Sequence, residues 1–190
     1  MEEVKIGKQV WMKINLNVDK FQNGEIIPEA KTDEEWKKAG ENQEPAWCYY
    51  DYNPVNGDEY GKLYNWYAVN DSRRIAPNGW HVPTNKEWLA LIKFLGGEDV
   101  MGDKVKNVYK HHWEDPKNIA TNESGFSGLP GGYRYYLGIF ANLGSNGNWW
   151  SASELNISNA YYLYLLSNSS KGYFHHDEKR NGFSLRCVRD

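Results

Sequence analysis

No apolar run in the sequence approaches the length of about twenty residues that a membrane-spanning helix needs. A basic excess is also missing, because 22 Lys and Arg residues stand against 25 Asp and Glu residues and give a formal net charge of −3. Binders of nucleic acid or of anionic membranes usually carry the opposite balance. The acidic start, Met1-Glu2-Glu3, is followed by no apolar leader. We therefore expect no membrane insertion, no nucleic-acid partner and no secretion signal, and localisation stays unassigned.

Cysteine is scarce, with Cys48 and Cys187 as the two examples, far apart and in no CxxC or metal-ligand spacing. A free cysteine packs as a small hydrophobe, so two buried thiols are expected. The alternative is one disulfide closing a long loop, which would require an oxidising compartment. Either way, the spacing does not indicate cysteine chemistry.

Two pairs of adjacent histidines, His111-His112 and His175-His176, are the candidates for a metal site. Neighbours in a strand point to opposite faces, so such a pair does not readily bind one ion. The sequence also contains no HExxH, no calcium loop, no GxSxG elbow and no phosphate loop. We expect surface or loop histidines, no metal, no cofactor and no catalytic residue.

The first part of the chain contains the signals of a hairpin and of a short helix. Apolar residues alternate from Val4 to Met12 around a Gly7-Lys8 turn, which predicts a β-hairpin. Thr32 with Glu35 forms a capping box, which predicts a helix over residues 34–38 that ends at Gly40.

Two further helices are predicted between residues 60 and 97. Aromatic and apolar residues at i, i+3 and i+4 spacing from Tyr60 to Val69 predict an amphipathic helix. Thr84 with Glu87 is a second capping box, and Gly96-Gly97 closes the helix that it begins. The predicted buried stripe of that helix is Trp88, Leu91, Ile92, Phe94 and Leu95.

After residue 120 the chain contains strand-sized apolar runs and no helix pattern. In a strand over residues 161–166, Tyr161, Leu163 and Leu165 share one face, and Tyr162, Tyr164 and Leu166 face outward on the other. A last strand, 183–188, turns Phe183, Leu185 and Cys187 inward. Helices first and strands last, in one domain over residues 1–190, predict an α+β fold with a mainly antiparallel sheet.

Residues 133–181 are rich in Tyr and other aromatic residues set among Ser, Asn and Gly. This is the composition of a paratope, because Tyr buries a large area at low entropic cost while small polar residues adapt to the partner. Neighbouring aromatic side chains that cannot all be core indicate a binding surface. A protein or another surface ligand is the expected target.

Several strings resemble the Fibrobacter succinogenes major paralogous domain, from one end of the chain to the other. The resemblance implies a C-type lectin-like fold, with two main helices packed on mostly antiparallel sheets and with paired N- and C-terminal strands. The motifs for calcium-dependent sugar binding are missing, since Glu44-Pro45-Ala46 departs from that pattern at its third place. The strings that carry the resemblance are 6–12, 60–69, 79–84 with Glu87-Trp88, 121–126, 129–134, 149–154 and 182–190.

Some members of this family resemble the variable proteins of diversity-generating retroelements, in which a reverse transcriptase rewrites adenines, and hence asparagine codons, in a C-terminal repeat. That resemblance implies a constant frame at 131–134, 144–147, 149–154, 159–160, 179 and 182–190, with a diversified ligand-binding region at about 132–181. The implied variable, ligand-binding positions are Tyr135, Tyr136, Leu137, Ile139, Leu155, Ile157, Tyr162, Tyr164, Leu166, Tyr173, His175, His176, Asp177 and Arg180.

The function expected from these observations is non-enzymatic ligand binding through a hypervariable surface, with display on a virion or cell surface through a partner. One alternative is a module of fixed sequence for adhesion or for binding a carbohydrate or peptide. Another is an enzyme like the formylglycine-generating enzymes, which share the broad fold and a similar stretch at Trp80–Trp88. The catalytic cysteine pair of those enzymes has no counterpart here.

Overall fold

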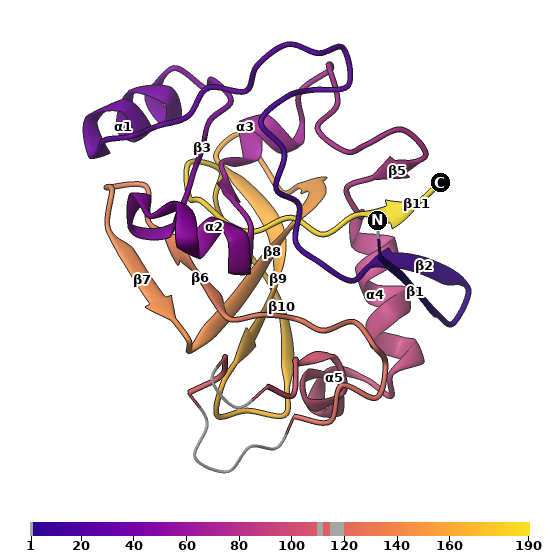
Figure 1. The fold of residues 1–190 in the computed structure, drawn as a ribbon. Helices are drawn as coiled ribbons and strands as arrows, with labels where there is room; N and C mark the ends of the chain where they lie inside the picture. Colours follow the sequence, from indigo (N-terminus) through magenta and orange to yellow (C-terminus); the bar gives the residue numbers. More distant parts are fainter. Residues whose placement is uncertain (1, 110–111, 115–119) are drawn as a thin grey trace.

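The computed structural model describes residues 2–109, 112–114 and 120–190. Short helices and one 3-10 turn, η1 (Tyr50–Tyr52), occupy the first part of the chain (Figure 1). The helices are α1 (Asp33–Glu41), α2 (Pro54–Tyr60), α3 (Trp66–Val69), α4 (Asn85–Phe94) and α5 (Glu98–Val105). The strands are β1 (Glu3–Ile6), β2 (Gln9–Met12), β3 (Trp47–Cys48), β4 (Leu63–Tyr64), β5 (Trp80–His81), β6 (Gly131–Arg134), β7 (Phe140–Leu143), β8 (Asn146–Glu154), β9 (Asn159–Leu166), β10 (Gly172–Glu178) and β11 (Val188–Arg189).

The strands form sheets with the orders β1-β2-β11-β5, β10-β9-β8-β6-β7 and β3-β4. Neighbours in these sheets run antiparallel, except β6 and β8, which are parallel. Strands from the two ends of the chain meet in the first sheet, where Val188 pairs with Trp11, and both termini lie at this end of the molecule (Figure 1). The predicted α+β class, the antiparallel sheets and the terminal pairing are thus confirmed.

The first hairpin and the first helix form where they were predicted. β1 and β2 pair around Gly7-Lys8, and the hydroxyl of Thr32 accepts from the backbone N–H of Glu35 at 3.2 Å. The helix continues to Glu41, however, instead of ending at Gly40. Gly40 is buried within the helix, and a Cβ added to it would stand 3.1 Å from the side chain of Arg180. The glycine therefore makes room for a packing contact and does not end the helix.

The predicted helix over residues 60–69 is wrong. Helix α2 ends at Tyr60, and the chain then passes through strand β4 before the short helix α3 begins. Gly61 has a φ of 77°, in the left-handed region, and a Cβ added to it would stand 2.9 Å from the carbonyl oxygen of Leu16. The aromatic spacing was produced by two short helices and a strand in succession, which periodicity cannot separate.

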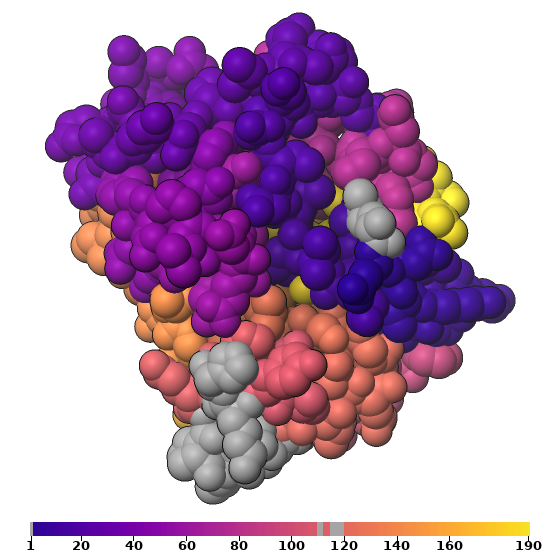
Figure 2. All heavy atoms as spheres, in the orientation of Figure 1, coloured from indigo at the N-terminus to yellow at the C-terminus, as the bar shows by residue number. Residues whose placement is uncertain are grey.

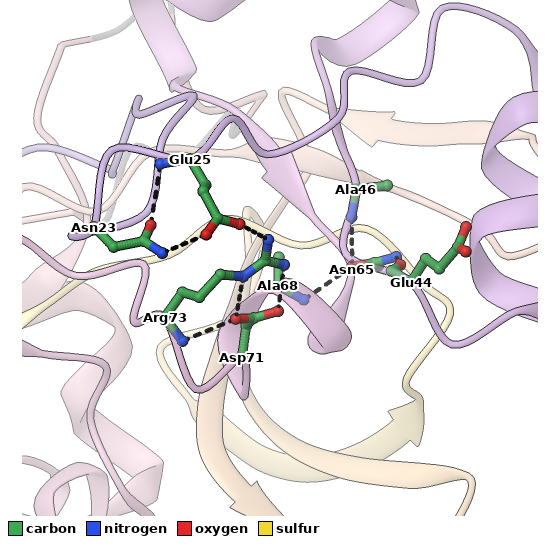
Figure 3. A network of polar contacts seen from close by, with 8 residues as sticks. All are labelled: Asn23, Glu25, Glu44, Ala46, Asn65, Ala68, Asp71 and Arg73. Carbon is green, nitrogen blue, oxygen red and sulfur yellow. Dashed lines mark hydrogen bonds and ion pairs between the residues drawn. The ribbon is translucent and has the colours of Figure 1, made fainter.

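Asn65 explains why α3 begins where it does (Figure 3). Its Oδ1 accepts from the backbone N–H of Ala68 at 3.1 Å and from that of Ala46 at 3.0 Å, while its Nδ2 donates to the carbonyl of Glu44 at 2.8 Å. One side chain therefore caps the helix and ties the 44–46 segment to it.

Helix α4 confirms the second capping box. Glu87 accepts from the backbone N–H of Thr84 at 2.8 Å, and Trp88 and Leu91 are buried in the core. Phe94 was predicted in the buried stripe, but its side chain is 64% exposed. Leu95, also predicted in the stripe, is buried, one turn after Leu91 and on the same side of the helix.

The final segment was predicted as one strand, and this is corrected: only Val188–Arg189 is a strand. Phe183, Leu185 and Cys187 are buried as expected, but the alternating residues Ser184 and Arg186 are buried as well. The segment passes between the layers and makes isolated bridges to β4 and β8, so both of its sides face protein.

Cys48 and Cys187 are free and buried, as predicted. Burial raises the pKa of Cys48 to about 11 and that of Cys187 to about 12, so both remain thiols at neutral pH. Within the described part of the chain, no helix has the length and apolar character to cross a membrane.

The first half of the chain covers most of the molecular face shown in Figure 2. Behind it, strands β8 and β9 carry Trp149, Leu163 and Leu165 into a core shared with α4 and α5. A second core cluster joins Trp150, Ala160 and Phe183 to residues of β4 and α3. The five-stranded sheet is therefore anchored from two directions, which fixes the positions of the side chains on its remaining surface.

Candidate functional site

The outer face of strands β9 and β10 carries a row of aromatic rings. Tyr164 and Tyr173 are cross-strand partners, and their rings stack at 4.7 Å between centroids and 11° between planes. Tyr162 stacks on Tyr164 at 5.5 Å, and its own partner across the strands is His175. We call these four residues the aromatic face. The stacking of the three tyrosines, with the ring of His175 meeting Tyr162 edge-on, gives the face a preferred geometry before any ligand arrives.

A shallow groove of about 150 Å³ begins at the aromatic face and extends toward β6. Aromatic rings, amides and one carboxylate surround it, which is a mixture suited to apolar contact with polar alignment. Asn148 is held in the groove wall by a hydrogen bond from its Nδ2 to the carbonyl of Gly132 at 3.1 Å. The lining residues are Tyr133, Tyr135, Asn146, Asn148, Tyr162, Tyr164, Asp177 and Phe183.

Tyr162 was predicted to face outward, and the structure corrects this. Its ring is half-buried, 4.6 Å from that of Phe183 and 6.1 Å from that of Trp150. Burial, together with the nearby carboxylate of Asp177, holds the pKa of the Tyr162 phenol well above its usual range. The even-numbered face of β9 is thus core at its Ala160 end and open at its Tyr164 end.

A second group of predicted positions lies around the turn between β6 and β7. The rings of Tyr135 and Tyr136 are 4.4 Å apart, and the guanidinium of Arg180 lies 4.4 Å over Tyr136. A hydrogen bond to Tyr136 raises the pKa of Tyr135. Leu137 and Ile139 project from the turn into solvent. Tyr135 is shared with the groove, so this group continues it rather than forming a separate site.

The tip of the β8–β9 hairpin presents two apolar side chains. Leu155 is exposed, and Ile157 is 80% exposed. The loop itself is ordered by Asn156, whose Oδ1 accepts from the backbone N–H of Ser158 and of Asn159 at 2.9 Å each. These side chains are therefore held out on a fixed loop.

Not every predicted position lies together. His176 is exposed on the opposite face of the sheet, where its ring meets the edge of Tyr161. Leu166 is half-exposed beside Asn146, at the far end of β9. The predicted positions therefore form the aromatic face with its groove, the adjoining turn and the hairpin tip, while His176 stands apart.

The adjacent histidines leave the strand toward opposite faces, as expected, His175 opposite Tyr162 and His176 opposite Tyr161, but their rings still stack at 4.8 Å. Strand β10 is the edge strand of its sheet. No neighbouring strand of the described chain lies along its outer side, so the two rings can meet around that edge. Both rings are exposed as predicted. Of the other pair, His111 lies outside the described residues. His112 lies in a loop, which is one of the two predicted settings, but its side chain is mostly buried and pairs with Glu59 at 2.8 Å.

Among the residues that the structure describes, no group of three or more His, Cys, Asp or Glu side chains could hold a metal ion.

Buried cations of the frame fix the strands that carry these positions. The side chain of Arg134 is fully buried and donates to Asp33 Oδ1 at 2.9 Å and to the carbonyl of Thr32 at 3.1 Å, between aromatic rings. Lys179 donates to Glu154 at 2.8 Å and to the carbonyl of Ile157. The two cations are buried, whereas the carboxylates of Asp33 and Glu154 are 48% and 59% exposed. Each cation therefore ties a buried position to a more exposed segment, Arg134 to the start of α1 and Lys179 to the tip of the β8–β9 hairpin.

Arg186 is the third such cation, and no carboxylate pairs with it among the described residues. It is fully buried and donates to Asn15 Oδ1 at 2.8 Å and to the carbonyls of Met12 and Phe126. Burial lowers the pKa of Arg186 to about 9, which still leaves it charged at neutral pH. Neutral amide and carbonyl oxygens therefore stabilise the buried charge of Arg186. The hydrogen bond to Met12 also links the last segment to the first hairpin.

Sequence reasoning missed part of the groove. Asn146 and Asn148 line it but were not among the predicted positions. They pair with Leu166 and Tyr164 across β8 and β9, so the period-two alternation of β8 would have placed them on the same face.

Comparison with known families gives one finding. The model of the Fibrobacter succinogenes major domain matches residues 4–189. No curated protein and no solved structure matches the chain.

Proposed function

The chain belongs to the Fibrobacter succinogenes major domain family, and on that premise we propose that it is a non-enzymatic binding protein with a diversified C-terminal surface. The variable residues are carried on a constant, buried frame. A C-type lectin-like fold, with the arrangement implied by the sequence resemblance, is part of this proposal. The target is a protein or another surface ligand, contacted through the aromatic face and the groove beside it.

One observation supports the proposal above all: burial differs between the two sets of positions. None of the fourteen predicted variable residues is buried, whereas most of the frame residues are. Around Tyr162 and Tyr164, for example, the frame residue Ala160 and the intervening Leu163 and Leu165 are fully buried. A surface that changes its residues can do so without refolding the protein only where such a separation exists.

The physical gain lies in pre-organisation. Tyr164 and Tyr173 are already stacked, and Lys179 and Arg134 hold the neighbouring loops. A ligand that meets this surface does not have to order a loose segment, so less of the interaction energy is lost on binding. Tyrosine also has few rotatable bonds for the area it buries, which lowers the same cost.

The state of the cysteines disfavours the enzyme alternative. A thiol that attacks or binds copper must be exposed and readily ionised. Burial raises the pKa of both Cys48 and Cys187, and each lies in a different core cluster. Thiol chemistry of the formylglycine-generating kind would need a cysteine that neither of these residues provides.

The remaining alternative is a binding module of fixed sequence. The groove supports this alternative, because its aromatic rings, together with Asn148 and Asp177, could bind a sugar or a peptide end without any diversification.

Deep sequencing of the gene in one culture separates a fixed module from a diversified surface. If the surface is diversified, sister copies differ at the fourteen variable codons and agree at frame codons such as those of Trp149 and Phe183. A near-identical repeat that differs at adenines, next to a reverse transcriptase gene, should accompany the copies. Agreement among copies at Tyr162, Tyr164 and His176, with no such repeat nearby, would establish the fixed module instead.

A second experiment tests the structural half of the proposal. In one library, Ile157, Tyr164, Tyr173 and His175 are randomised together, and protease-resistant clones are selected. The matched library randomises Trp149, Trp150, Phe183 and Leu185, which lie in the buried frame. Most members of the first library should remain folded and almost none of the second. Equal losses in the two libraries would contradict a surface that tolerates diversification.

A further inference from the structure

A second concave surface lies away from the aromatic face, between the β1–β2 hairpin and helix α4. The hairpin projects past the body of the molecule at this end (Figures 1 and 2). The groove beneath it has a volume of about 890 Å³ and shares no residue with the aromatic face. Its lining residues are Lys5, Ile6, Gly7, Lys8, Gln9, Ala90, Lys93 and Phe94.

The floor of this groove is apolar and exposed. Phe94, which sequence periodicity placed in the core, lies with 64% of its surface open and with its ring beneath the turn at Gly7. Ala90, one turn before Phe94 on the same helix, is also exposed and lines the groove. A large aromatic side chain left open in a concave site marks a place where a partner binds.

The groove is also a rigid one. The Nε2 atom of Gln9 donates to the carbonyl of Glu87 at 3.1 Å, which fastens the hairpin to the first turn of α4. Ile6 is buried against Trp88, Leu91 and Ile92 of the same core cluster. The hairpin and the helix therefore keep their separation, and the groove is pre-formed rather than opened by a ligand.

The rim carries positive charge without compensation. Lys5, Lys8 and Lys93 are exposed, and in the described part of the chain none of them forms an ion pair. Two acidic side chains on the same elements have other partners: Glu3 of β1 pairs with Arg189 at 2.8 Å, and Glu87 of α4 pairs with His81 at 2.6 Å. A chain with a net charge of −3 thus concentrates unpaired cations around one apolar groove.

We propose that this groove binds an acidic segment of a partner protein, with an apolar side chain seated on Phe94 and carboxylates paired with Lys5, Lys8 and Lys93. Charge complementarity selects the acidic segment, and the apolar floor selects the anchor. The concave shape favours a peptide over a flat anionic membrane. Because these residues lie outside the variable positions, the contact is constant while the aromatic face changes.

The test uses the whole protein and three probes. The first is a short synthetic peptide in which a Leu-Phe pair is flanked by glutamates on both sides. The second is the same peptide with glutamines in place of the glutamates. The third is a vesicle of phosphatidylcholine, with and without phosphatidylserine. Binding is measured by calorimetry, and the site by amide shifts in NMR spectra.

The glutamate peptide should bind and shift the amides of Lys5, Gly7 and Phe94, with little change at Tyr164 or Tyr173. The triple variant K5E/K8E/K93E should bind it at least about tenfold more weakly, with an unchanged melting temperature. Its matched control is K20E/K37E/K38E, which changes the same net charge at exposed lysines elsewhere and should bind normally.

Four results would overturn the proposal. They are no binding of the glutamate peptide, equal binding of the glutamine peptide, equal loss in the control variant, and binding to phosphatidylserine vesicles without binding to the peptide. None of them bears on the diversified surface, because the sequencing experiment above does not involve this groove.

Discussion

The two faces of strand β9 differ in what they demand of their residues. On the inner face, Leu163 and Leu165 are fully buried against Trp149. On the outer face, Tyr164 is half-exposed and touches mainly Tyr173, which is itself half-exposed. The same backbone therefore carries residues whose replacement would leave a cavity and residues whose replacement would leave open surface. Neighbours in sequence can be constrained to very different degrees, and burial decides which are which.

The largest effect is expected from removing Trp149 of β8, which pairs with Leu163 and lies on the inner face of the same sheet. Trp149 is fully buried, its Nε1 donates to Asn15 Oδ1 at 2.9 Å, and its ring meets the edge of Phe126. Trp149→Ala should lower the free energy of unfolding by about 3–5 kcal/mol through the cavity that it leaves. Tyr173→Ala, on the outer face, should cost less than about 1 kcal/mol. Chemical denaturation measures both, and similar losses would erase the distinction between the faces.

The next largest effect is expected at Gly132, which lies under the groove. Its φ of 63° is left-handed, and an added Cβ would stand 2.6 Å from the carbonyl oxygen of Ala141 and 2.8 Å from the amide nitrogen of Leu143. Gly132→Ala should therefore cost about 2 kcal/mol or more, because β6 and β7 would have to separate.

Gly24→Ala is the control for backbone strain alone. Gly24 also has a positive φ, but nothing lies within 4 Å of its added Cβ. Gly24→Ala should therefore lower the free energy of unfolding by only about 1 kcal/mol. If chemical denaturation gives the same loss for both variants, backbone strain rather than the contact between β6 and β7 explains the loss in Gly132→Ala. The two strands would then accommodate the added Cβ more easily than the close distances imply.

A smaller effect separates the two ends of the outer face. Tyr162 packs on Phe183, whereas Tyr164 does not touch the core cluster. Tyr162→Ser should cost about 1–2 kcal/mol, and Tyr164→Ser no more than about 0.5 kcal/mol. Thermal melts of the two variants, made side by side, give the difference. Equal and small losses would place Tyr162 fully on the binding surface; equal and large ones would place both residues in the core.

Sequence reasoning succeeded where one local signal acts alone. The Gly7-Lys8 turn, the Thr84–Glu87 capping box and the alternation of β9 from Leu163 onward each involve residues close in sequence, and each is confirmed. Alternation also separated Leu163 from Tyr164 correctly.

It failed where tertiary contacts decide. The pattern from Tyr60 to Val69 spans two short helices and a strand, because Asn65 and Gly61 interrupt it through contacts with residues 16 and 44–46. The lining of the groove by Asn148, and the burial of Arg134 and Arg186, likewise depend on segments far away in the sequence. Periodicity carries no information about such partners.

The smallest expected effect concerns pH and the other sheet. His81, on β5, lies between two carboxylates, with Nδ1 2.7 Å from Asp190 and Nε2 2.6 Å from Glu87. Burial lowers the pKa of His81, but the hydrogen bonds to Asp190 and Glu87 outweigh it, and the net shift is upward.

A raised pKa in the folded state means that the charged imidazole stabilises the fold. That contribution is complete below the ordinary histidine pKa of about 6.5 and is lost as the pH rises through the higher folded value. Because the His81 side chain is 38% exposed, solvent screens the pairs, and the melting temperature should fall by only about 1–3 °C between pH 6 and pH 9.

His81→Gln should remove that part of the pH dependence, whereas the exposed His176→Gln should leave it in place. NMR titration of the imidazole gives an independent value. If His81 titrates below its ordinary pKa, or if both variants keep the full slope, the two carboxylates do not hold this edge of the first sheet. A loss of pH dependence confined to the His81 variant would instead show that pH acts on the junction of β5, β11 and α4. The phenols of Tyr162 and Tyr164 do not contribute, because their pKa values are raised further above this range.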